Sequence, residues 1–90
     1  MNKTALDCLF ESNRQRFIEE WATLLAFPSI SADPERTRDC VACAQWLGAH
    51  LETMGFAVQM LSTGSKPLVF AERRGHPDRP VVLFYGHYDV

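Results

Sequence analysis

This sequence lacks a long apolar run, a strong excess of one charge and an even set of cysteines. No apolar run approaches the length of a membrane span, so no membrane contact is expected. Nine basic and eleven acidic residues give a formal net charge of −2, which offers no basic footprint for nucleic acid. The N-terminal residues lack the apolar core of a signal peptide, so the expected location is the cytoplasm.

The three cysteines, Cys8, Cys40 and Cys43, are too few and of the wrong parity for a disulfide framework, which favours reduced thiols. Cys40 and Cys43 form a Cys-x-x-Cys pair, but the pair lies well inside an expected helix rather than at a helix N-terminus. A structural zinc site would need two more ligands, and no second pair exists. We therefore predict that both thiols pack in a helix, with a redox or metal-binding protein as the competing interpretation.

The length and periodicity of the chain are typical of one small α/β domain, since 90 residues allow a single core of limited size. Five segments have the periodicity of regular structure, in the order helix, helix, strand, strand, strand: 4–26, 34–54, 56–61, 68–73 and 81–85. Pro28 ends the first helix, Asp33 and Pro34 begin the second, and Gly55 closes it. Short links favour antiparallel pairing, and both helices would cover the sheet with their apolar stripes.

The end of the chain contains the candidate chemistry. Val81–Tyr85 is an unbroken apolar run, which is typical of a strand buried on both faces. After Gly86 come His87 and Asp89, which point the same way in extended backbone. A neutral imidazole can bind a metal through one nitrogen while its other nitrogen donates to a carboxylate that fixes the tautomer. The alternative is a histidine and an aspartate at a strand end that are exposed to solvent or cap a loop.

These residues also carry a resemblance. Gly86–Val90 after an apolar strand resembles the first metal-site motif of the dizinc aminoacylase and dipeptidase family, which includes acetylornithine deacetylase, succinyl-diaminopimelate desuccinylase, carnosinase and the carboxypeptidase G group. Trp21–Ser31 resembles the first helix and following loop of that family, and Leu47–Phe56 its second helix running into the first strand. The resemblance extends from about Phe17 onward, and the sequence of residues 85–90, Tyr-Gly-His-Tyr-Asp-Val, is closest to the dipeptidase branch.

The resemblance implies that residues 1–90 are the N-terminal portion of a single three-layer α/β/α zinc-peptidase domain with a mixed sheet. Its members hydrolyse amide bonds of small peptides or N-acyl amino acids, use two zinc ions per active site with cobalt or manganese as alternatives, and form homodimers. His87 matches a metal ligand, and Asp89 matches the catalytic-site carboxylate that orients this histidine. The remaining ligands and the general base come later in such enzymes, so the chain alone is expected to be inactive.

The same sequence is also consistent with a function of another class. A small noncatalytic α/β module could associate with another chain through an exposed strand edge. Val81–Tyr85, if unpaired, would present such an apolar edge and would lower solubility or promote oligomerisation.

Overall fold

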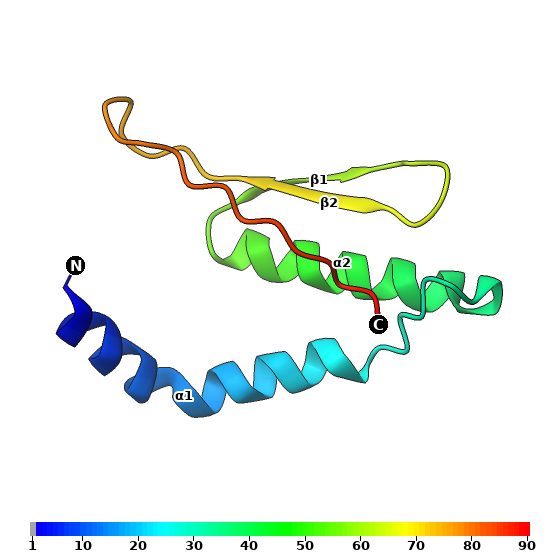
Figure 1. The fold of residues 1–90 in the computed structure, drawn as a ribbon, viewed down its shortest axis with the longest axis horizontal. Helices are drawn as coiled ribbons and strands as arrows, with labels where there is room; N and C mark the ends of the chain where they lie inside the picture. Colours follow the sequence, from blue (N-terminus) through cyan, green and yellow to red (C-terminus); the bar gives the residue numbers. More distant parts are fainter. Residues whose placement is uncertain (1) are drawn as a thin grey trace.

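The computed structural model describes residues 2–90, and its elements follow one another in a simple order (Figure 1). They are α1 (Lys3–Ala26), the 3-10 helix η1 (Pro34–Arg36), α2 (Thr37–Thr53), β1 (Ala57–Leu61) and β2 (Leu68–Glu72). The predicted α/β class is thus confirmed in its coarse form, as helices combined with one antiparallel sheet. Neither long helix of residues 2–90 has the combination of length and apolar character that crossing a bilayer requires.

Helix α1 begins and ends where local signals predict. The Asn2 side chain accepts a hydrogen bond from the Ala5 N–H at 2.8 Å, as an N-cap does. The helix continues without a break to Ala26, and Phe27 is extended because the α region is disfavoured before Pro28. The predicted range of 4–26 is therefore confirmed to within one residue.

The prediction that both helices cover the sheet is wrong for α1. None of its residues is buried, and it packs on α2 rather than on the strands of the described chain. The contact includes a tilted pair of Phe27 and Trp46 rings with centroids 6.2 Å apart, and an ion pair of Glu20 Oε2 with His50 Nε2 at 3.3 Å. Two strands about 4.8 Å apart form a surface roughly one helix wide, and α2 already occupies it.

Helix α2 holds the small core. Asp33 caps η1, the short helix before α2, because its side chain accepts a hydrogen bond from the Glu35 N–H. At the other end of α2, the Gly55 N–H donates to the Glu52 carbonyl oxygen and the Phe56 N–H donates to the Leu51 carbonyl oxygen. Gly55 adopts φ +90°, so the predicted glycine closure is confirmed as a Schellman-type cap. Among the described residues, the fully buried apolar side chains lie on α2: Cys40, Cys43 and Ala44.

The hairpin packs on α2 at a glycine. Strands β1 and β2 pair antiparallel, in a register that runs from Ala57 opposite Glu72 to Leu61 opposite Leu68. Gly48 is buried in α2, and a Cβ added there would lie 2.9 Å from the Met60 side chain. The lack of a side chain at this position therefore lets helix and sheet approach closely.

The predicted third strand at 81–85 is wrong for this chain. The described residues contain two strands, and Val81–Tyr85 belongs to neither. Its side chains are 70–94% exposed rather than buried on both faces. An apolar run becomes a strand only beside a backbone that completes its hydrogen bonds, and among the described residues no backbone hydrogen bond joins Val81–Tyr85 to the outer edge of either strand. The segment instead runs from the loop after β2, at the open end of the hairpin, towards the α1–α2 connection (Figure 1).

Candidate functional site

The end of the chain is held against the loop that joins the two helices. The Val90 N–H donates to the Ser29 carbonyl oxygen at 2.9 Å, and the Ser29 hydroxyl donates to the Tyr88 carbonyl oxygen at 3.1 Å. Ser29 is completely buried. These two hydrogen bonds join segments almost 60 residues apart, since Ser29 and Tyr88 are separated by 59 positions.

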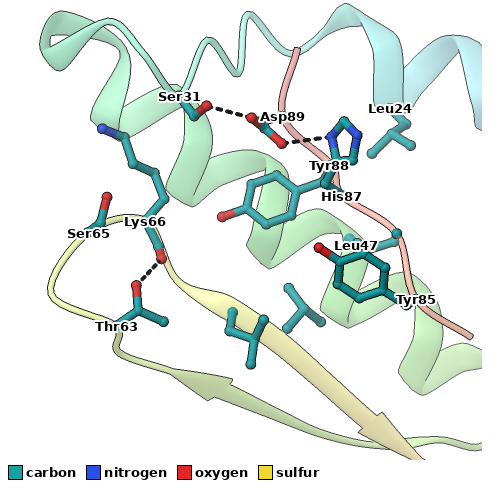
Figure 2. Close-up of a pocket in the computed structure, with 13 residues that line it drawn as sticks. Leu24, Ser31, Leu47, Thr63, Ser65, Lys66, Tyr85, His87, Tyr88 and Asp89 are labelled. Atoms are coloured by element: carbon teal, nitrogen blue, oxygen red, sulfur yellow. Dashed lines mark hydrogen bonds and ion pairs between the residues drawn. The ribbon is translucent and has the colours of Figure 1, made fainter. Parts of the chain in front are cut away.

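Tyr88 anchors the other side of this segment. Its hydroxyl donates to the Pro67 carbonyl oxygen at 2.7 Å, which ties the segment to the β1–β2 connection. Burial raises the pKa of Tyr88 above its ordinary value, so the phenol stays a hydrogen-bond donor. The Tyr88 ring points towards residues 63–66 and away from the His87 ring (Figure 2). The residues on either side of Tyr88 consequently share the opposite face.

His87 and Asp89 occupy that face and contact each other. His87 Nδ1 lies 2.9 Å from Asp89 Oδ1. The His87 side chain is 76% exposed, whereas that of Asp89 is 34% exposed. A proton on Nδ1 would be donated to the carboxylate, and this tautomer leaves Nε2 with an open lone pair. The structure thus brings together the two residues that the sequence singled out.

Ser31 completes a short chain of hydrogen bonds. Its hydroxyl donates to Asp89 Oδ2, while Oδ1 of the same carboxylate faces His87 (Figure 2). The Ser31 hydrogen bond is the main cause that lowers the pKa of Asp89, and the His87 hydrogen bond lowers it further. Asp89 is therefore ionised at neutral pH and remains an acceptor for both neighbours.

These side chains line one open cleft of about 550 Å³. Leu24 and Leu47 form part of its apolar wall, and the β1–β2 connection contributes Thr63, Ser65 and Lys66. The Thr63 hydroxyl donates a hydrogen bond of 2.9 Å to the Lys66 carbonyl oxygen within this connection (Figure 2). The cleft thus combines an imidazole, a carboxylate, hydroxyl groups and one ammonium group beside an apolar wall.

The residues that hold the site together are not predicted by the sequence. The sequence places Ser29 and Ser31 only in a loop, and Tyr88 only within the Gly86–Val90 motif. The available signal was the alternation Ser-x-Ser in a short loop after Pro28. Hydroxyl side chains at such positions commonly bind backbone or carboxylate groups.

The cysteine pair is part of the small core. Cys40 and Cys43 are buried in α2, as predicted, and burial raises the pKa of the Cys43 thiol. The Cys43 sulfur faces the Tyr88 carbonyl oxygen at 4.0 Å. A raised pKa keeps the thiol protonated, which is the opposite of what a redox or metal-binding cysteine needs.

The described residues supply only part of a metal-binding site. Residues 2–90 contain no group of three His, Cys, Asp or Glu side chains that could hold an ion. Nε2 of His87 offers one nitrogen ligand, and Asp89 offers the supporting carboxylate that such a histidine usually has. A catalytic zinc site normally takes three protein ligands, so the geometry fits one corner of such a site.

The sequence of this chain is similar to part of one curated metallodipeptidase. The chain is 31% identical over 93 residues to the Cys-Gly metallodipeptidase DUG1 of Candida albicans, an alignment that takes in 89% of this chain. It spans about a fifth (19%) of that relative's length. No protein-family model matches the chain, and no solved structure matches it significantly. The sequence of this α/β chain is therefore similar to part of a metallodipeptidase.

Proposed function

We propose that this chain is the N-terminal part of a metal-dependent dipeptidase in which His87 binds one catalytic metal ion. The observation that carries the proposal is the 2.9 Å contact of His87 Nδ1 with Asp89, which leaves Nε2 as the free nitrogen of an exposed ring. The similarity to a metallodipeptidase supports the same reaction class. In the complete protein the domain would be a three-layer α/β/α structure with a mixed sheet, acting as a homodimer.

The residues of this chain would position the metal rather than perform every step. A metal on His87 would polarise the scissile carbonyl and lower the pKa of a bound water. Asp89 holds the proton on Nδ1, fixes the orientation of the ring and increases the basicity of Nε2. Zinc is the expected ion, with cobalt or manganese as substitutes, and small dipeptides such as Cys-Gly are the expected substrates.

The test uses the protein encoded by the full reading frame that contains this chain. We expect zinc-dependent hydrolysis of Cys-Gly, loss of both activity and zinc affinity in His87→Ala, and a loss of about ten- to a hundredfold in Asp89→Ala. Activity is measured by release of free glycine, and zinc affinity by competition with a chromogenic chelator.

A matched control is His76→Ala, because this histidine lies in an exposed loop away from the cleft. It should keep normal activity and zinc affinity. Zinc affinity and turnover in His87→Ala equal to those of the unmodified protein would disprove the assignment.

A noncatalytic α/β module that binds another chain is the second candidate function. The exposure of Val81–Tyr85 favours it, because five consecutive apolar side chains face solvent there. A protein that binds no zinc at micromolar concentration and hydrolyses no dipeptide, yet is stably folded, would support this function over the first.

A further inference from the structure

We infer that Ser31 is a positioning residue for the His87–Asp89 pair. It holds the Asp89 carboxylate in the rotation that keeps His87 in the Nδ1-protonated tautomer. The inference deepens the function proposed above and rests on it for the role of the metal. Ser31 belongs to the loop between the helices, 58 positions before Asp89 in the chain.

The carboxylate of Asp89 has two oxygens with different tasks. Oδ2 accepts from the Ser31 hydroxyl, and Oδ1 faces His87 Nδ1 at 2.9 Å. A carboxyl group turns about a broad, roughly two-fold torsion, so a single contact would hold it only weakly. A donor on each oxygen restricts that rotation. The ring of His87 is mostly exposed and has no close packing of its own to fix it.

The backbone of the two segments is independently held together. Ser29 binds the Tyr88 carbonyl oxygen and the Val90 N–H, so the loop and the final segment stay in contact without Ser31. Removal of the Ser31 hydroxyl should therefore loosen the carboxylate while the segment stays docked. The Ser31→Ala variant therefore distinguishes a positioning role of Ser31 from a structural one.

The tautomer of His87 provides a readout that does not depend on activity. In the 90-residue chain labelled with ¹⁵N-histidine, the ring nitrogen shifts at pH 8 distinguish the Nδ1–H form from the Nε2–H form. His87→Gln assigns the signals among the three histidines. We expect mainly Nδ1–H in the unmodified chain, a mixture of both forms in Ser31→Ala, and return to Nδ1–H in Ser31→Thr.

Two further variants keep the test decisive. Asp89→Asn places an amide donor beside Nδ1 and should reverse the tautomer, as a donor in place of the carboxylate does in a catalytic triad. Ser12→Ala is the matched control, since its hydroxyl only binds the Cys8 carbonyl oxygen within α1, and it should change nothing. Circular dichroism shows whether each variant is folded.

Cobalt binding in the protein from the full reading frame, followed by visible absorption, tests the link to the metal. Loss of one hydrogen bond predicts an affinity about three- to tenfold weaker in Ser31→Ala, with recovery in Ser31→Thr. An unchanged tautomer and an unchanged affinity in folded Ser31→Ala would overturn the inference while leaving the proposed function intact. A changed tautomer in a protein that binds no cobalt would support the positioning role and disprove the metal proposal.

Discussion

The three cysteines differ in burial, and burial decides their chemistry. Cys8 is exposed on α1, whereas Cys40 and Cys43 are completely buried in α2. Burial also raises the pKa of Cys43, which lowers the thiolate fraction at neutral pH. The Cys-x-x-Cys spacing alone allowed a redox interpretation, and the surroundings of the two sulfurs argue against it.

The thiols should therefore react at very different rates. In a short pulse of iodoacetamide at pH 7.5, we expect Cys8 to be alkylated first and Cys40 and Cys43 at least about tenfold more slowly, because thiolate fraction and access govern the rate. Peptide mass spectrometry measures each site. Cys8→Ser should remove the fast phase, and rapid labelling of Cys43 in the folded chain would contradict the prediction.

At the level of elements, local signals determine where each helix begins and ends. Asn2 and Asp33 accept backbone hydrogen bonds at the beginnings of helical segments, and Gly55 closes α2 with φ +90°. The turn at Gly55 also directs the chain from α2 into β1, which then packs back on the same helix. The cap therefore connects a local conformation to the packing of the hairpin.

Gly55→Ala should destabilise the fold. A side chain at positive φ costs about 1–2 kcal/mol, so the free energy of unfolding should fall by that amount. Urea unfolding followed by circular dichroism measures it. Gly75→Ala is the matched control, because φ there is not positive and a Cβ would meet open space. Equal stability of the two variants would show that the cap contributes nothing.

At the scale of the whole molecule, the described chain leaves much apolar surface exposed. The buried side chains are few and small, while large apolar residues face solvent along α1 and along Val81–Tyr85. The Val81–Tyr85 run lies outside the sheet, makes no backbone hydrogen bond within the described residues and exposes its apolar side chains. Such a segment readily pairs with another chain.

The 90-residue chain should therefore self-associate through this segment. We expect the weight-average mass to rise with concentration in sedimentation equilibrium. The double variant Val82→Lys/Phe84→Lys should weaken association by at least about tenfold, since like charges oppose edge pairing. Leu6→Lys, on the exposed face of α1, should not. A monomeric unmodified chain across the same concentrations would be incompatible with this prediction.

The sequence by itself determined the helix ends and the candidate pair. Helix ends depend on Pro28, Asp33 and Gly55, whose effects come from backbone sterics and hydrogen bonds to near neighbours. His87 and Asp89 are two residues apart, a spacing at which side chains of extended backbone point the same way, and their side chains are in contact. All of this acts over a few residues, which is why it could be predicted.

Only the tertiary structure decided which distant groups meet. It brought Ser31 to Asp89 and Ser29 to Tyr88, packed α2 rather than α1 on the hairpin, and left Val81–Tyr85 outside the sheet. Neither strand pairing nor a contact across 58 positions is encoded in local periodicity. Both depend on which backbone and side-chain partners the folded chain places within hydrogen-bond distance.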